Sequence, residues 1–462
     1  MSYTDIDRPS DYFRVKTYSG SSSDGNAITW DETDNNMRPD WLWLKNRTAS
    51  QEHWLANSVR GTGKFLESNS TNTESSDGAS GLASFDTNGF TLNDSARTNR
   101  NTMVGWGWSA GGTAPAITYV VKVVSDSGNK YRFDDFGTSA VTLDLQEGGT
   151  YTFDQSDSSN SGHPLRFSTT SNGTHGGGSE YTTGVTVTGT PGNSGAKTVI
   201  TVAASAPTLY YYCTQHSAMG GQANTNSLFG SSNFSGTIQS TVSAGNTQGF
   251  SIATWTGNAT SSQSVGHGLN SVPKAIFTKN TDNGSQPYKC YFSGVGNAAY
   301  LQLNSTGAAS ISGVWSSTTP TSSIINISND TGINGSGNTI IGYNFTNVKG
   351  YQHIGSYSGN GNDIFIYTGF KVGWLLVKVH DGTNGWLIID AKRSPANPQG
   401  KYIYANSHSA EGTVTYGEFF SNGFGWKGTN SIAVNQSGKN YVYIAIAENP
   451  YVTSSGVPAT AR

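Results

Sequence analysis

Three stretches of this sequence repeat the same order of features, and this repetition restricts the possible fold more than any other property of the chain. They begin at Phe13, Phe250 and Tyr351. Each opens with a segment that ends in Tyr or Trp, then Ser or Thr, then Gly; an apolar run ending in Lys follows, and an alternating aromatic segment closes the stretch. Internal similarity of this kind indicates one structural unit used several times. The sequence therefore predicts three related units.

Hydrophobic alternation predicts that these units consist of β-strands. In the closing segment of the third unit, Val442, Ile444 and Ile446 alternate with Tyr441 and Tyr443, which is the pattern of a strand with both faces partly covered. No segment combines a 3.6-residue apolar period with caps at both ends, and Gly, Asn and Ser supply turns between the segments. We therefore expect an all-β, multidomain chain of antiparallel β-sandwich units, jelly-roll or lectin-like in topology.

A segment of different character separates the first and second units. It contains a series of short β-prone stretches at regular spacing, from ITYVVKVVS to TLYYYC, between a Gly/Pro boundary and a polar exit. This spacing predicts another β-sandwich. The expected domains are a first repeat unit at 1–113, the inserted sandwich at 114–246, a second repeat unit at 247–349 and a third at 350–462.

Composition excludes several classes of partner. Charged residues make up 12% of the chain, the formal net charge is -3 and the eight His are scattered, so no basic field is available to hold nucleic acid or anionic lipid. No apolar run reaches the roughly 18 residues that a membrane-spanning helix needs, and the N-terminal sequence lacks the pattern of a secretion signal. With only Cys213 and Cys290 present, a disulfide framework is not expected.

The strongest chemical signal lies in the segment YYYCTQHSAMGG. Cys213, His216 and Met219 occupy every third position after an aromatic, β-prone run. A thiolate with imidazoles forms a trigonal set suited to copper, and a distant thioether is the usual axial ligand. The spacing alone is weak evidence, but His163 in the upstream segment SGHPLRF adds a further imidazole.

The insert resembles the cupredoxin family over most of its length. The resemblance is carried by LDLQEGGTYTFDQ, SGHPLRFSTT and YYYCTQHSAMGG, and it implies a Greek-key sandwich with one type 1-like copper ion. Carried over position by position, the ligands would be His163, Cys213, His216 and Met219. The alternative interpretation is that these side chains are packed core groups and that no metal is bound.

Four further positions of the insert and its surroundings need an interpretation. Gln215 stands where several cupredoxins have Pro, and Gly162 precedes the first His, so both bear on the rigidity of the ligand loops and on the groups that support them. We expect His175, in NGTHGGGS, to be an exposed loop residue and not a ligand. Cys290, in YKCYF, is expected to be an ordinary buried thiol.

Enzymatic chemistry is not predicted. The acids are dispersed, and Asp390, Glu411 and Glu418 are better interpreted as turn or edge residues than as a glycosidase pair. No phosphate-binding loop, zinc finger or dinucleotide fingerprint occurs. Several tryptophans could stack on sugar rings, but alternating Trp within strands more often belongs to the core. The tryptophans concerned are Trp41, Trp43, Trp106, Trp108, Trp374 and Trp386.

The three units also resemble repeats in tail-fibre-like and other virion structural proteins of marine phages, especially cyanophages. The resemblance covers most of the chain outside the insert and is carried by WLWLKNR with NSVRG, VGHGL followed by PK, GSYSGNG with YTGF, and the ending IAENPYVTSSGVPATAR. The first unit departs most, because it lacks the GHGL turn. These motifs are structural, so they imply a location and a role and no particular reaction.

The resemblance implies a virion exterior protein that is assembled in the host cytoplasm. We expect a tail-fibre or appendage component that mediates assembly and host adsorption, with the first unit docked to the particle and the later units facing the host. The alternatives are a capsid decoration (cement) protein and a copper-binding redox protein. Expected partners are other virion proteins and a host-surface receptor or glycan, and a homo-oligomer is expected because trimers are common in fibres.

Overall fold

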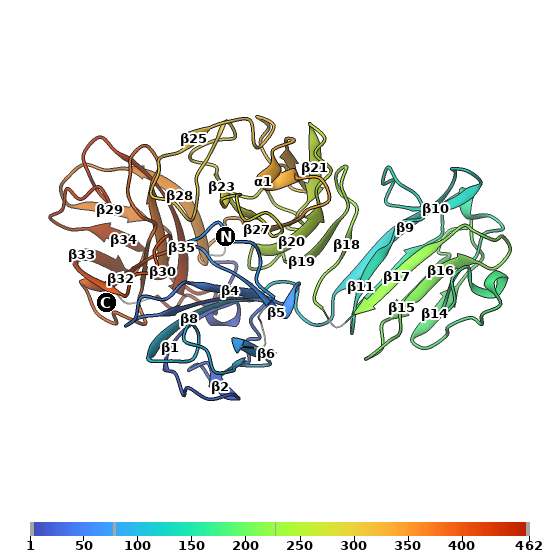
Figure 1. Cartoon of the computed structure of the whole chain (residues 1–462), viewed down its shortest axis with the longest axis horizontal. Helices are drawn as coiled ribbons and strands as arrows, with labels where there is room; N and C mark the ends of the chain where they lie inside the picture. The colour runs from blue at the N-terminus through green and yellow to red at the C-terminus, as the bar shows by residue number, and fades with distance from the viewer. Residues whose placement is uncertain (1–3, 77–79, 227, 459–462) are drawn as a thin grey trace.

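The computed structural model describes residues 4–76, 80–226 and 228–458, and its regular structure is almost entirely β-strand. The all-β prediction is therefore confirmed. Figure 1 shows the three repeat units gathered around one centre and the inserted module projecting to the side. None of the described helices is long and apolar enough to cross a membrane. These helices are three 3₁₀ turns (Pro9–Asp11, Ser158–Asn160 and Gly173–Gly176) and the α-helical turn α1 (Thr331–Asn334).

The first unit contains a five-stranded antiparallel sheet in the order β1-β8-β3-β4-β5. A smaller sheet in the order β2-β7-β6 packs against it and closes a local apolar core. The strands are β1 (Phe13–Ser19), β2 (Asn26–Thr29), β3 (Trp41–Asn46), β4 (Trp54–Asn57), β5 (Gly61–Leu66), β6 (Leu82–Asp86), β7 (Gly89–Leu92) and β8 (Thr102–Trp108).

The second unit contains a six-stranded sheet in the order β18-β19-β20-β27-β22-β23 and two short strand pairs, β21 with β26 and β24 with β25. The strands of the main sheet are β18 (Ser231–Asn233), β19 (Ser240–Gly245), β20 (Phe250–Thr256), β22 (Ala275–Asn280), β23 (Lys289–Phe292) and β27 (Thr339–Phe345). The paired short strands are β21 (Gln263–Gly266), β24 (Ala299–Tyr300), β25 (Ser310–Ile311) and β26 (Ile324–Ile327).

The third unit forms an eight-stranded sheet in the order β28-β35-β30-β31-β32-β33-β34-β29. Its strands are β28 (Gln352–Ser358), β29 (Ile364–Tyr367), β30 (Phe370–Val379), β31 (Leu387–Asp390), β32 (Gln399–Tyr404), β33 (Gly412–Phe420), β34 (Gly423–Trp426) and β35 (Asn440–Pro450).

All three units share one topology at their centres. In each, the closing strand lies between the opening strand and the strand that ends the apolar run, giving β1-β8-β3, β20-β27-β22 and β28-β35-β30. The registers also correspond, because Phe13 and Trp41 both pair with Trp108, and Phe250 and Ala275 both pair with Phe345. The repeated order of features in the sequence therefore reflects a repeated strand order.

One apolar core joins the three units. A single cluster of buried side chains takes residues from every unit, including Trp41, Phe250 and Trp374. Trp41 stacks on Tyr343 of the second unit with ring centroids 4.4 Å apart, and Trp108 meets Trp374 of the third unit edge to face at 5.5 Å. Separate cores were expected, whereas here one face of each sheet is buried against the other two units. The tryptophans considered for sugar stacking are all core residues: Trp41, Trp43, Trp106, Trp108, Trp374 and Trp386.

Three buried lysines connect the units in a cycle, and we call them the lysine ring. Lys45, Lys279 and Lys378 end the apolar run of the first, second and third unit, and each side chain is buried. Each ammonium donates to a main-chain carbonyl of another unit, so that the first unit bonds the third, the second bonds the first and the third bonds the second. The Nζ to oxygen distances are 3.1 Å for Lys45 to His408, 3.1 Å for Lys279 to Thr71 and 3.0 Å for Lys378 to Thr306.

The three acceptor carbonyls occupy equivalent places in the sequence. Each follows an Asn-Ser pair, giving Asn-Ser-Thr in the first two units and Asn-Ser-His in the third. The Asn side chain holds this loop, because its Oδ1 accepts a main-chain N–H from the neighbouring strand or loop in every unit. These bonds join His53 to Asn69 at 3.1 Å, Tyr288 to Asn304 at 3.1 Å and Trp386 to Asn406 at 2.7 Å.

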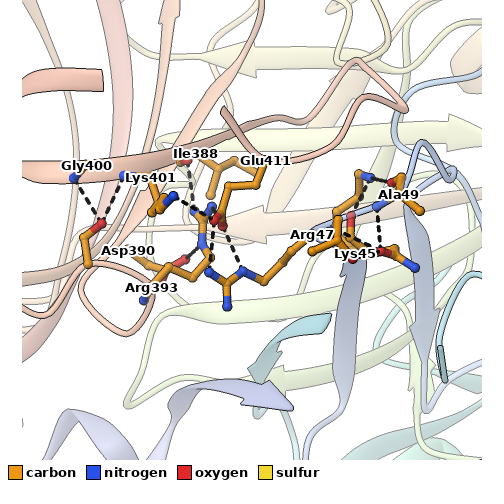
Figure 2. Close-up of polar contacts among 12 residues, drawn as sticks. Lys45, Arg47, Ala49, Ile388, Asp390, Arg393, Gly400, Lys401 and Glu411 are labelled. Carbon is orange, nitrogen blue, oxygen red and sulfur yellow. Dashed lines mark hydrogen bonds and ion pairs between the residues drawn. The ribbon is translucent and has the colours of Figure 1, made fainter. Parts of the chain in front are cut away.

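A buried ionic network reinforces the contact between the first and third units (Figure 2). Arg47 of the first unit donates from Nε and Nη2 to the two carboxylate oxygens of Glu411, both at 2.9 Å. Arg393 donates to Glu411 at 3.1 Å and to Asp390 at 2.6 Å, and the Trp106 indole donates to the same Asp390 oxygen at 3.0 Å. Because each buried charge has a partner of opposite sign, the desolvation penalty is offset. Asp390 ends β31 and Glu411 directly precedes β33, so both acids lie at strand ends and also take part in this network.

The inserted module is a sandwich of two sheets with its own core. One sheet has the order β10-β9-β12-β15-β14 and the other the order β11-β17-β16-β13, and their facing side chains form a separate apolar cluster. The strands are β9 (Ala116–Ser125), β10 (Asn129–Phe133), β11 (Leu143–Gln146), β12 (Thr150–Asp154), β13 (Leu165–Ser168), β14 (Val185–Thr188), β15 (Lys197–Thr201), β16 (Leu209–Cys213) and β17 (Gly221–Asn226).

The module is attached to the second unit by polar and apolar contacts. Tyr119 donates to the carbonyl of Ser232 at 2.8 Å, and Phe234 inserts its ring into the module's core. Strands β18 and β19 lie within the range predicted for the insert, but β19 pairs with β20 of the second unit. The change of sheet therefore precedes the predicted boundary at 246, because the polar segment that resembled an exit linker forms strands on the edge of the second unit.

The lysine ring predicts a rise in stability with pH. Burial lowers the pKa of Lys45, Lys279 and Lys378 to about 8 from the ordinary value of 10.5. Above pH 8 the unfolded chain therefore binds more protons than the folded chain, so the free energy of unfolding should increase between pH 8 and pH 9.5, by on the order of 1 kcal/mol per lysine. Well below pH 8 all three lysines are charged in both states, and the cost of burying the charges is fully present.

Urea unfolding at pH 7.5, 8.5 and 9.5, followed by tryptophan fluorescence, measures this slope. Lys279→Met should reduce the slope by about one third, since one of three equivalent groups is removed. Lys427→Met is the matched control, because the Lys427 side chain is 66% exposed. An unchanged slope in Lys279→Met would contradict the assignment of the pH dependence to the ring.

Candidate metal centre

Two paired strands and one loop bring three of the predicted ligands, His163, Cys213 and His216, together, and Met219 is buried in the core of the same module. Cys213 is the last residue of β16, and its main chain pairs with Leu165 of β13, which begins two residues after His163. His216 and Met219 lie in the loop between β16 and β17. The antiparallel register of β13 and β16 therefore places His163 beside Cys213 before the loop contributes its side chains.

The three strongest ligands form a compact cluster. The Cys213 sulfur lies 3.9 Å from Nδ1 of His163 and 3.8 Å from Nδ1 of His216, and the three ligand atoms all lie within 4.8 Å of one another. Cys213 and Met219 are buried in the module's core, whereas His163 is half-buried and His216 is exposed. The centre thus lies at the end of the sandwich, with sulfur ligands inside and one imidazole at the surface.

The donor set and its spacing fit a single metal ion. With a metal–sulfur distance of about 2.3 Å and a metal–nitrogen distance of about 2.0 Å, ligands of one ion have sulfur and nitrogen atoms about 3.5 to 3.7 Å apart. The observed separations of 3.8 Å and 3.9 Å are close to these values. One thiolate and two imidazoles with a nearby thioether are the ligands of copper electron-transfer sites. A bound copper ion would supply one-electron redox chemistry.

Burial and a neighbouring imidazole favour the neutral form of His163, which is the form that can bind a metal. Burial lowers the pKa of His163, and the neighbouring His216 lowers it further. The imidazole of His163 is therefore neutral near pH 7, which leaves a nitrogen lone pair available for a metal.

Local backbone geometry shapes the two ligand loops. Gly162 has a φ of 75°, a left-handed conformation that Gly adopts without strain. The departure from the cupredoxin pattern at this position therefore suits the local turn. In the second loop, Ala218 has a φ of 60°, and its N–H donates to Oδ1 of Asn172 at 2.7 Å.

Buried polar groups hold the main chain at His163. The carbonyl of His163 accepts from the Tyr131 hydroxyl at 2.9 Å and from Nε2 of Gln155 at 2.8 Å, while the His163 N–H donates to the carbonyl of Asn160 at 2.8 Å. Burial and the adjacent Cys213 thiol raise the pKa of Tyr131 well above its usual range, so the phenol is protonated and able to donate. These residues carry no sequence signal of their own, because the contacts join segments far apart in the chain.

The remaining candidates lie outside the cluster. His175 is exposed, as expected, and is not among the clustered ligands, but its Nε2 lies 3.0 Å from the carbonyl oxygen of Cys213. The imidazole therefore supports the end of β16. Gln215 is exposed in the ligand loop. Cys290 is a free, buried thiol whose pKa burial raises, in agreement with the prediction for this residue.

Comparison with known proteins identifies one family. The model of a domain of unknown function, DUF7483, matches residues 8–134 and 222–450, and the segment between these ranges contains all four candidate metal ligands. No curated protein and no solved structure matches the chain. The family match covers well over half of the sequence and includes the main sheets of all three repeat units, so the chain belongs to the DUF7483 family, whose function is unknown.

Proposed function

We propose that this chain is a structural protein of a phage virion exterior and serves as a tail-fibre or appendage component that mediates assembly and host adsorption. The observation that carries the proposal is the closed cycle of three units around one core. In each unit a buried lysine donates a hydrogen bond to a main-chain carbonyl of another unit. One unit therefore cannot separate without leaving buried ammonium or carbonyl groups unpaired. Such an arrangement suits a rigid scaffold that has to keep its shape outside the cell.

The geometry also supports display of the later units and of the inserted module. The module projects from the side of the three-unit core (Figure 1), where it is accessible to a partner. In the third unit, the edge strand β29 presents Phe365 and Tyr367 with 49% and 61% of their surface exposed. Exposed aromatic side chains of this kind are available to a receptor or glycan on a host surface.

Self-association is part of the proposal, but it must use surfaces other than the central faces. The apolar faces that separate chains would use to form a trimer are already buried within one chain. A homo-oligomer, and contacts with other virion proteins, would therefore involve outer strands and loops. Capsid decoration is the alternative role for the same scaffold, since a rigid protein with lateral contacts can also reinforce a capsid.

Immunoelectron microscopy of intact particles tests the location. An antibody against the third unit is expected to label the tips of tail appendages, because the later units are proposed to face the host. Even labelling over the capsid would exclude the fibre role and make decoration the function. If no particle is labelled, the proposed virion location fails.

A second candidate function, copper binding and redox chemistry, is supported by the cluster at the end of the inserted module. The sulfur–nitrogen separations of 3.8 Å and 3.9 Å and the neutral His163 suit a single copper ion. The ligands would be His163, Cys213, His216 and Met219. An exposed His216 would give a redox partner access to the centre, and the scaffold role does not depend on it.

Copper titration of the full chain tests this site. The unmodified protein is expected to bind one copper ion with a visible thiolate-to-copper absorption band. Cys213→Ser should abolish the band and weaken binding by more than about 100-fold, since the loss of a direct ligand exceeds the effect of losing a supporting residue. Cys290→Ser is the matched control, because it also removes a buried thiol but lies in the central core.

The same variants test whether the three-unit scaffold and the inserted module fold independently of each other. In Cys213→Ser the three repeat units should unfold at the same temperature as in the unmodified protein, because the module has its own core. Equal copper binding by Cys213→Ser and the unmodified chain would rule out the proposed centre. Cooperative loss of the whole fold in Cys213→Ser would instead indicate that the module and the scaffold depend on each other.

A further inference from the structure

We infer that Tyr131 is the residue that positions the two ligand loops of the candidate copper centre. This inference rests on the proposed copper-binding function. Tyr131 lies at the middle of β10, the outermost strand of its sheet, and its side chain is fully buried. It is none of the four proposed ligands.

Tyr131 reaches both loops through different groups. Its hydroxyl donates to the carbonyl of His163 at 2.9 Å, and its main-chain N–H donates to the carbonyl of Met219 at 3.0 Å. The adjacent Lys130 side chain also donates to the carbonyl of Ala218. The outer edge of β10 therefore forms hydrogen bonds with the loop that carries Met219. The Tyr131 side chain extends to the other loop, which carries His163.

The start of the Met219 loop is already joined to the His163 loop, because the Thr214 N–H donates to the carbonyl of Pro164 at 3.1 Å. The other end of the loop, at Met219, leads into β17, which lies on the far side of β16 from β13. Tyr131 spans this separation from the opposite sheet. A second donor, Gln155, also bonds the His163 carbonyl at 2.8 Å, so loss of the Tyr131 hydroxyl should loosen the first loop without unfolding it.

A positioning role predicts a specific effect on the centre. Residues that orient metal ligands typically change metal affinity by about 10- to 100-fold when they are replaced. Tyr131→Phe keeps the buried ring and removes only the hydroxyl. We therefore expect Tyr131→Phe to weaken copper binding by about this factor and to shift the thiolate-to-copper absorption band, since the imidazole of His163 loses part of its restraint.

Tyr119→Phe provides the matched control. Tyr119 belongs to the same core and is equally buried, and its hydroxyl donates to a single carbonyl, that of Ser232, at 2.8 Å. Both substitutions remove a buried phenol-to-carbonyl hydrogen bond, but the Tyr119 bond faces the second unit, whereas the Tyr131 hydroxyl also lies beside the Cys213 thiol. Tyr119→Phe should lower the melting temperature of the copper-free protein about as much as Tyr131→Phe, with copper affinity and absorption unchanged.

Hydrogen–deuterium exchange in the copper-free full chain makes the test independent of copper binding. Tyr131→Phe should accelerate exchange in peptides covering residues 160–166, whereas Tyr119→Phe should not. Peptides covering 214–220 should be unaffected, because the bond from Tyr131 to Met219 is made by the main-chain N–H and is retained. Equal exchange of 160–166 in the two variants, or copper affinity unchanged by Tyr131→Phe, would overturn the inference. If the unmodified chain binds no copper, the proposed copper function fails, and the exchange result still decides whether the Tyr131 hydroxyl orders the His163 loop.

Discussion

Burial of one apolar face of each repeat unit against the other two is the constraint on which the rest of the structure depends. A strand that ends beneath such a core leaves main-chain carbonyls that need donors. The lysine ring supplies them: Lys279, for example, donates to Thr71 of the first unit and also to the carbonyls of Asn280 and Gln286 of its own unit. An ammonium has three N–H groups and no acceptor, so three carbonyls satisfy it completely. The cost of burying the charge is thereby partly offset, and the units are held in a fixed order.

The presence of all three units in one chain allows each to differ from the others. A homotrimer would have to repeat an insert in every subunit, whereas here one module occurs once, between the first and second units. Its two connections are tied together by a single side chain: Gln146 donates to the carbonyl of Gly112 at the entry and accepts from the N–H of Gly230 at the exit. An insert whose ends lie together can be accommodated without distorting the host sheets. The strand order of the scaffold consequently survives the insertion.

The sequence predicted those features that depend on neighbouring residues, but it could not predict contacts between distant segments. Alternation identified the strands, and the unbroken apolar run from Trp41 to Leu44 is buried on both faces of its sheet. The spacing of Cys213, His216 and Met219 also anticipated the loop of the candidate centre. Which sheet faces would meet was not encoded in any local pattern, and the role of Tyr131 depends on a hydrogen bond across 32 positions.

The candidate centre combines a part fixed by the fold with a part that is free to adjust. Cys213 belongs to a strand ladder, and the main chain of His163 is held by buried donors, so these two groups keep their positions without help from a metal. His216 is exposed in a loop, and its position depends less on the core. In zinc fingers, by contrast, no preformed site exists and metal binding drives folding. Here the sandwich core bears the cost of ordering most of the site, so the module does not need a metal ion in order to fold, and the affinity for a metal would depend on how firmly the two loops are held.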